Sequence, residues 1–483
     1  MNKLVEEILK KYKRIWALKY ASGLLGWDIE TYMPPKGANA RGEVFAHLDL
    51  IQKQEILSLA SFVEEAEKIE NLDDLEKGII RVLNREIRFY KKVPEEIIVK
   101  LNKVTSEGTI YWRIDRKKDE FNSFKPYLQR IIEINKIIAE KLGYEKHPYN
   151  ALLDLYEEGL NVEDMNSIFN VITHKLPILL EKDLPSSHEL EHLKYNEDEM
   201  KKVNEEVLKL LNMPFDRFRM DISTHPFTIG ISVDDVRITT RYEGIDFKRS
   251  LYSTIHECGH AIYNLNIDKN LEGTPVGIGA SSGIHESQSR FWENIIGRSK
   301  EFVELIYHIL KNLRFEKNYT ISDFYIYFNL VKPSLIRVDA DELTYNFHIA
   351  LRFEIEKRII NDEIEMDEIP SLWNELMEKY LKIRPKGYAD GFLQDMHWSK
   401  GWFGYFPTYT LGNVIAGIIW KSFKNLKNKV QSGDLESIKE FLKDKIHKYG
   451  AIYAPKDLLK RSFNETYNAE YLVEYLFEKY NLI

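Results

Sequence analysis

The chain has 483 residues, 44% of them hydrophobic, so it is long enough to bury a large core in one large domain or in two to three ordinary ones. Its 68 lysine and arginine residues stand against 76 aspartate and glutamate residues, which gives a net charge of −8. This balance argues against nucleic acid or an anionic membrane surface as a partner.

The cysteine content and the first residues predict a cytoplasmic protein. The one cysteine, Cys258, excludes an intrachain disulfide and fits a reducing compartment. Residues 1–27 are charged and amphipathic where a signal peptide would be apolar, and no apolar run approaches the length of a membrane span. Glutamine occurs at only six positions and 30% of residues are charged, a pattern typical of heat-adapted proteins, so we expect thermostability.

Hydrophobic residues recur along most of the chain at helical spacing, as Leu4, Ile8 and Ile15 do near the start. The same periodicity predicts further helices over residues 72–92, 126–142, 162–182, 301–313 and 433–449. The chain is therefore predicted to be mainly α-helical.

One region departs from this pattern. Residues 222–242 are rich in β-branched side chains that alternate with polar ones, which predicts a small β-sheet. Residues 183–192 have the composition of a surface loop, but no linker or internal repeat divides the chain. We therefore expect residues 1–483 to form a single catalytic unit, which could have two lobes around a cleft.

The stretch "STIHECGHAIYNL" at residues 253–265 contains two histidines one helical turn apart. In a helix, His256 and His260 differ by about 40° in azimuth and about 6 Å along the axis, so both imidazoles can bind one zinc ion. Glu257 points about 100° from His256, where it can polarise a water without binding the metal. The spacing predicts a catalytic metal site.

Two neighbours in this motif have expected structural roles. Cys258 falls on the opposite side of the helix from the histidines, so we expect it to pack into the core as a small apolar group. Gly259 costs about 1 kcal/mol relative to alanine inside a helix, which predicts that another segment approaches closely there.

A catalytic zinc site needs a third protein ligand and an open position. Residues 283–297 predict a second helix, and Glu286 near its start completes a set of two histidines and one glutamate. His285 and Glu293 are the alternatives. Both are better placed to support a ligand than to bind the metal themselves.

Several ordered motifs resemble those of the M32 metallocarboxypeptidases, the family of Taq-type and archaeal thermostable carboxypeptidases. The resemblance covers essentially the whole chain. The motifs are "LGWDIETYMPPKG" at 25–37, "PYNALLDLYEEG" at 148–159, "HPF" at 225–227, "DVRIT" at 235–239, "HECGH" at 256–260, "HESQSRFWEN" at 285–294, "IRVDADELTY" at 336–345, and "GFLQDMHW" with "GYFPTY" at 391–409.

The resemblance implies a mainly α fold like that of neurolysin and angiotensin-converting enzyme, with a deep active-site groove and a homodimeric assembly. It also implies removal of single residues from the free C-termini of peptides, with one divalent ion per subunit, zinc first and cobalt as the alternative. One departure from the family pattern is Asn264, where the family often has an acidic residue.

Peptide hydrolysis needs a base for the attacking water, and Glu257 is the expected base and later the proton donor to the leaving amine. A carboxypeptidase must also bind the substrate's free carboxylate, which a guanidinium does with two parallel hydrogen bonds. Arg337, in the family motif, is the expected residue, with Arg237 and Arg241 as alternatives. An ion pair to Asp339, Asp341 or Glu342 is the competing interpretation of Arg337.

The resemblance assigns His397 and Tyr409 to the oxyanion or to substrate contacts, with Tyr405 as a rival for the tyrosine role. All three belong to a glycine-containing segment, residues 394–412, typical of a loop that lines a cleft.

Three residues near the predicted sheet have two possible roles each. His225 could bind the substrate backbone or brace the sheet. Asp235 and Arg237 could orient a histidine ligand or hold the cleft wall.

Two other functions remain as alternatives. A metallo-oligopeptidase that cuts internally would use the same metal chemistry but would need no carboxylate-binding arginine. A catalytically silent peptide-binding protein of the same fold would have no chemical need for Glu257.

Overall fold

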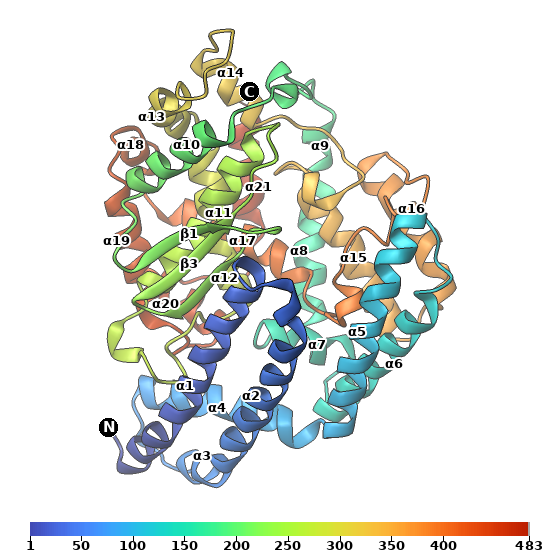
Figure 1. The fold of residues 1–483 in the computed structure, drawn as a ribbon, viewed down its shortest axis with the longest axis vertical. Helices are drawn as coiled ribbons and strands as arrows, with labels where there is room; N and C mark the ends of the chain where they lie inside the picture. The colour runs from blue at the N-terminus through green and yellow to red at the C-terminus, as the bar shows by residue number, and fades with distance from the viewer. Residues whose placement is uncertain (482–483) are drawn as a thin grey trace. The chain divides into compact units, whose positions relative to one another are not determined.

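The computed structural model describes residues 1–481, which are mainly α-helical with one small sheet, as predicted (Figure 1). Over these residues, no helix is both long enough and apolar enough to span a bilayer. The α-helices are α1 (Lys3–Thr31), α2 (Ala38–Ser58), α3 (Ala60–Ala66), α4 (Asp74–Lys92), α5 (Glu95–Lys118), α6 (Lys125–Leu142), α7 (Tyr149–Tyr156), α8 (Val162–Lys175), α9 (Pro177–Leu180), α10 (Glu197–Leu210), α11 (Lys248–Leu265), α12 (Ser282–Arg290), α13 (Lys300–Leu310), α14 (Ile321–Phe328), α15 (Tyr345–Ile360), α16 (Ile369–Leu381), α17 (Pro407–Ser422), α18 (Leu426–Gln431), α19 (Leu435–Lys445), α20 (Pro455–Phe463) and α21 (Glu470–Tyr480).

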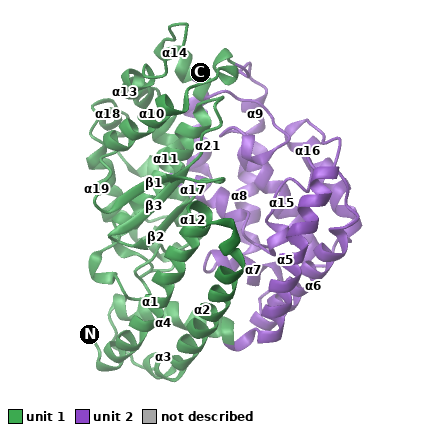
Figure 2. Ribbon diagram, in the orientation of Figure 1, with its two compact units in different colours: residues 1–90, 188–328, 419–466 green, residues 91–187, 329–418, 467–483 purple. Residues whose placement is uncertain are grey.

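The chain forms two compact units, each built from three separate stretches (Figure 2). Unit 1 comprises residues 1–90, 188–328 and 419–466, and unit 2 comprises residues 91–187, 329–418 and 467–483. The sheet and the helix with the HECGH motif belong to unit 1, whereas Arg337 and His397 belong to unit 2. The single catalytic unit and the deep groove stay predictions.

The sheet of unit 1 has three strands, β1 (Phe218–Ile222), β2 (Thr228–Ser232) and β3 (Asp235–Thr240), in the order β1-β3-β2. Strand β1 is parallel to β3 and β2 is antiparallel to it, with a bulge between Gly230 and Ser232. The predicted sheet was placed correctly before the histidine helix, but it begins four residues earlier than the predicted boundary at Ile222. Strand β1 has a clear alternation of its own, with Phe218, Met220 and Ile222 separated by two charged residues, but all of it except Ile222 lay outside the predicted bounds.

Three other predicted segments differ in detail. The helix predicted over 162–182 ends at Lys175, because Pro177 has no N–H to donate and begins the separate helix α9. The predicted loop at 183–192 closes with a short 3₁₀ helix, Glu189–His192, which buries Leu190. The predicted helix at 283–297 is α-helical only to Arg290 and continues as a π-helix over Phe291–Gly297.

Candidate metal centre and substrate-binding cluster

Helix α11 carries the HECGH motif and packs against β2, β3 and α12 (Figure 2). Thr254 Oγ1 lies 3.0 Å from Thr240 Oγ1 on β3, and the Tyr252 hydroxyl donates to the Gly297 carbonyl over 3.0 Å. Both contacts are buried. They fix α11 between the sheet and the segment that follows α12.

The predictions for Cys258 and Gly259 are confirmed. Cys258 is fully buried, and this burial raises the pKa of its thiol well above the usual value. A Cβ on Gly259 would lie 2.5 Å from the Gln288 carbonyl oxygen and 2.6 Å from Ser289 Cα, both on α12. The glycine therefore allows the two helices to approach closely enough to bring their side chains to one site.

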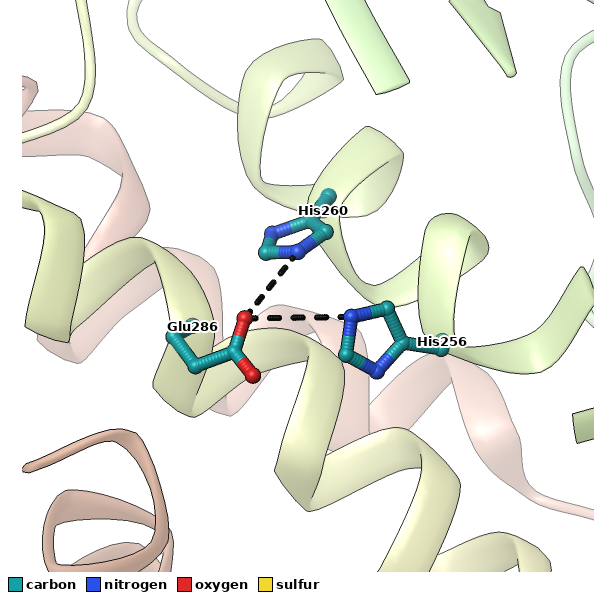
Figure 3. A group of neighbouring side chains, drawn as sticks. All are labelled: His256, His260 and Glu286. Atoms are coloured by element: carbon teal, nitrogen blue, oxygen red, sulfur yellow. Dashed lines mark ion pairs between the residues drawn. The ribbon is translucent and has the colours of Figure 1, made fainter. Parts of the chain in front are cut away.

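Helix α12 delivers the third candidate ligand. Its N-cap residue, Ser281, accepts a hydrogen bond from the Ile284 N–H over 3.1 Å, which starts the helix just before Glu286. Glu286 Oε2 lies 3.7 Å from His256 Nε2 and 3.4 Å from His260 Nε2 (Figure 3). The structure thus brings His256, His260 and Glu286 together, with one candidate ligand atom from each within 4.8 Å of the others.

Glu293 and His285, the alternatives for the third ligand, contact the histidines at Nδ1, on the side of each ring away from Glu286. His256 Nδ1 is 2.9 Å from Glu293 Oε2, and His260 Nδ1 is 2.6 Å from His285 Nδ1. Each candidate ligand histidine therefore has a partner at Nδ1 while its Nε2 faces Glu286. Two imidazoles and one carboxylate, with the imidazoles held from behind, match the donor set of catalytic zinc sites, so these residues fit a divalent cation.

The charges of the site favour a carboxylate at both glutamates. Burial opposes ionisation of Glu286, but Arg290 and the two histidines outweigh it and hold the pKa far below its usual range. The pKa of Glu293 is lowered in the same way by Arg290, His256 and Arg298. Arg298 Nη2 lies 3.0 Å from Glu293 Oε1. The π-helix that presents Glu293 is a feature that often occurs at functional sites.

Glu257, the expected base, is 7% exposed. The hydroxyl of Thr228 on β2 donates to Glu257 Oε2 over 2.6 Å, and Thr228 Oγ1 is also 3.0 Å from the Glu257 carbonyl oxygen. One side of the carboxylate is therefore held by the sheet. The sequence carried no signal for this contact, because Thr228 appears only as one β-branched residue of a predicted strand.

A second cluster lies within unit 2, around Arg337. Its Nη2 is 2.8 Å from Asp395 Oδ1, its Nε is 3.0 Å from the same oxygen, and its Nη1 donates to the Tyr345 hydroxyl over 2.9 Å. The other carboxylate oxygen, Asp395 Oδ2, lies 2.6 Å from Arg352 Nη2. One carboxylate thus pairs with two guanidinium groups. Within residues 1–481, the carboxylate that pairs with Arg337 is therefore Asp395, and not Asp339, Asp341 or Glu342 as in the competing interpretation.

Burial and charge set the protonation of this cluster. Burial disfavours charge on Arg337, but Asp395 and neighbouring tyrosines raise its pKa well above the usual value. Burial lowers the pKa of Arg352 to about 10, so both arginines are charged at neutral pH. Within the described residues, the side-chain bonds of Arg337 use three of its five N–H groups, which leaves donors for a further anion.

His397 lies beside the same cluster in unit 2. Its Nε2 is 3.2 Å from the Tyr409 hydroxyl, and burial lowers its pKa to about 3, so the imidazole is neutral at physiological pH. Its Nδ1 is buried and has no hydrogen-bond partner among residues 1–481. The Arg337 guanidinium lies over the Tyr409 ring, 5.1 Å from its centre. The Tyr405 ring belongs to the same group, with its centre 5.4 Å from that of Tyr409 and 5.7 Å from that of His397.

The residues of the sheet region have mainly structural contacts. Arg237 pairs with both oxygens of Asp235 over 2.7 and 2.8 Å and lies over the Trp27 ring, 4.3 Å from its centre. Arg241 pairs with Glu243. His225 is exposed, and its carbonyl oxygen accepts a hydrogen bond from Ser223 Oγ over 2.6 Å.

Comparison with known proteins shows what the chain is similar to. The model of the carboxypeptidase Taq (M32) metallopeptidase family matches residues 7–480. Thermostable carboxypeptidase 1 of Pyrococcus furiosus is 47% identical over 99% of both chains, and carboxypeptidase 1 of Bacillus subtilis is 36% identical over 99% of this chain and 98% of the relative. The solved structure of Pyrococcus furiosus carboxypeptidase covers 99% of both chains with a TM-score of 0.98. That of Trypanosoma cruzi metallocarboxypeptidase 1, 33% identical, also covers 99% of both chains, with a TM-score of 0.93.

Proposed function

Because the chain belongs to the carboxypeptidase Taq (M32) family and is a metallocarboxypeptidase, we propose that it removes single residues from the free C-termini of peptides with broad specificity. The observation that carries the proposal is that His256, His260 and Glu286 lie close together in space. The residue that follows His256, Glu257, supplies a buried carboxylate. We further propose that these three residues bind one Zn²⁺ ion, with Co²⁺ as the alternative.

A divalent ion held by His256, His260 and Glu286 would act as a Lewis acid, which would polarise the scissile carbonyl and make a water more acidic. Glu257 takes the proton from the attacking water and later gives it to the leaving amine. Thr228 donates to one carboxylate oxygen, which leaves the other for this proton transfer. Glu293 and His285 accept hydrogen bonds from the ligand histidines and keep their rings oriented.

Arg337 is proposed to bind the terminal carboxylate of the substrate. Two observations support this. Asp395 holds the guanidinium, and both Arg337 and Asp395 are charged at neutral pH. Arg337 also has N–H donors that remain available for a substrate carboxylate. His397 and Tyr409 are proposed to contact the oxyanion or the substrate, with Tyr405 as a rival. Because His397 is neutral, it acts as a hydrogen-bonding group and not as a charge.

For the sheet residues the contacts support a structural role. Arg237 pairs with Asp235 and lies over the ring of the buried Trp27. His225 accepts a hydrogen bond from Ser223 at its backbone carbonyl. We therefore propose that Asp235 and Arg237 hold this wall of unit 1, and that any substrate contact of His225 is made by its exposed ring.

The test is a mass-spectrometric time course on one peptide with a free and an amidated C-terminus, using protein stripped of metal and then reloaded with Zn²⁺ or Co²⁺. We expect stepwise loss of C-terminal residues from the free acid only, and only with metal. Internal cleavage of both peptides would favour an oligopeptidase, and no cleavage with any metal would favour a silent peptide-binding protein. The variant Glu257→Gln should bind metal and lose turnover.

Three further properties belong to the proposal. We propose a homodimer, which sedimentation equilibrium would test, and a cytoplasmic location, which fits the single buried cysteine. Thermostability, proposed from the composition, would appear as an unfolding midpoint far above those of ordinary mesophilic domains.

A further inference from the structure

The two ligand histidines are held from behind by groups of different charge. His256 Nδ1 faces the carboxylate of Glu293, which is itself paired with Arg298. His260 Nδ1 faces the imidazole of His285, 2.6 Å away. One histidine is therefore oriented by a full negative charge and the other by another ring.

The direction of the hydrogen bond between His260 and His285 follows from the proposed metal site. A neutral imidazole that binds a metal through Nε2 carries its proton on Nδ1. His260 must then donate its Nδ1–H to His285 Nδ1, so His285 carries its own proton on Nε2. That atom lies 3.3 Å from Asn264 Oδ1. The hydrogen bonds therefore run from His260 through His285 and end at an amide oxygen.

We propose that Asn264 is a positioning residue for the metal site: its amide oxygen fixes the tautomer of His285, and through it the ring of His260 and the affinity for the divalent ion. This inference rests on the proposed assignment of His260 as a ligand. Because an amide oxygen is a weaker acceptor than a carboxylate, asparagine at this position should give a lower affinity for the divalent ion than aspartate would. The variant Asn264→Asp should therefore bind metal more tightly than the natural chain.

Gly230 on β2 provides a second way to disturb the same contact. A Cβ on this glycine would lie 2.8 Å from Asn264 Cγ and 2.9 Å from its Nδ2. The glycine thus leaves the space in which the amide lies against the strand. The variant Gly230→Ala should displace the Asn264 amide without changing the chemical groups of His260, His285 or Asn264.

The experiment measures the Kd of the metal-free protein for Zn²⁺ by competition with a chromophoric chelator, and the visible absorption of the Co²⁺-loaded protein. We expect Asn264→Leu and Gly230→Ala to weaken binding about tenfold, and Asn264→Asp to strengthen it. The Co²⁺ bands should shift in these variants, because the ligand field of His260 changes. Asn266→Leu, at the end of the same helix, is the matched control and should leave both readouts unchanged.

The order of affinities separates hydrogen bonding from packing. If Asn264 only braced the helix, both Asn264 variants would bind Zn²⁺ more weakly than the natural chain. If it acts as a hydrogen-bond acceptor, the affinity for Zn²⁺ should fall from aspartate to asparagine to leucine at this position. The inference is overturned if both variants shift the Kd in the same direction, or if neither differs from Asn266→Leu. If Asn264→Leu does not fold, Asn264→Asp and Gly230→Ala still decide.

Failure of the underlying metal site has a different signature. A natural chain that binds no Zn²⁺ at one ion per subunit, or that binds as tightly as His260→Ala, would overturn the metal-site proposal and this inference together. A natural chain whose affinity depends on His260 but not on residue 264 would overturn the inference alone.

Discussion

Replacing Thr228 by valine removes the hydroxyl that donates to Glu257 Oε2 over 2.6 Å and keeps the branched shape of the side chain. A hydrogen bond to a charged acceptor contributes about 1.5–3 kcal/mol. Glu257 is 7% exposed, so a water can replace part of the lost bond, and the lower end of this range applies. A loss of about 1.5 kcal/mol in the transition state lowers kcat slightly more than tenfold.

The assay compares kcat and KM on one free-acid peptide for the natural chain, Thr228→Val and Thr228→Ser, with metal content measured in parallel. Thr228→Ser keeps the hydroxyl and should retain most of the activity. The expected result for Thr228→Val is a lower kcat with KM and bound metal unchanged, because the hydroxyl contacts the base and not the ligands. Activity of Thr228→Val close to that of the natural chain, or equal loss in Thr228→Ser, would refute this role.

Three further predictions concern other parts of the chain. Arg337→Ala should lose most activity toward free-acid peptides, mainly through KM, and unchanged kinetics would contradict the carboxylate assignment. Gly259→Ala should lower stability by about 1–3 kcal/mol and weaken metal binding, because its Cβ would meet the α12 backbone, whereas the control Gly42→Ala, with nothing within 4 Å, should be neutral or stabilising. Burial of Glu356 raises its pKa from 4.5 to about 7, so the folded state holds this proton more tightly than the unfolded chain. Stability should therefore fall by up to about 3 kcal/mol as the pH rises from 4.5 through 7, and denaturation of Glu356→Gln should show a smaller fall.

The helical class, the small sheet and the metal-binding motif were predictable because each depends on local spacing. His256, Glu257 and His260 lie within five consecutive residues of one helix, so their relative directions follow from helix geometry alone. The cost of a glycine inside a helix likewise predicted the close approach at Gly259. The boundaries were less accurate. Strand β1 has the alternation of a strand but lay almost wholly outside the predicted bounds, and the change from α-helix to π-helix at residue 291 depends on backbone hydrogen bonding that residue spacing does not specify.

The sequence by itself determined which chemical groups the chain offers and placed Glu286 near the start of a second helix. Only the tertiary structure decided which groups meet. Arg337 pairs with Asp395, 58 residues further along the chain, and not with the acids beside it, while Thr228 reaches Glu257 from a separate strand. Asn264 stood out in the sequence as a departure, but its partner His285 is 21 residues away. Such contacts depend on how helices and strands pack, and side-chain spacing along one segment carries no record of that packing.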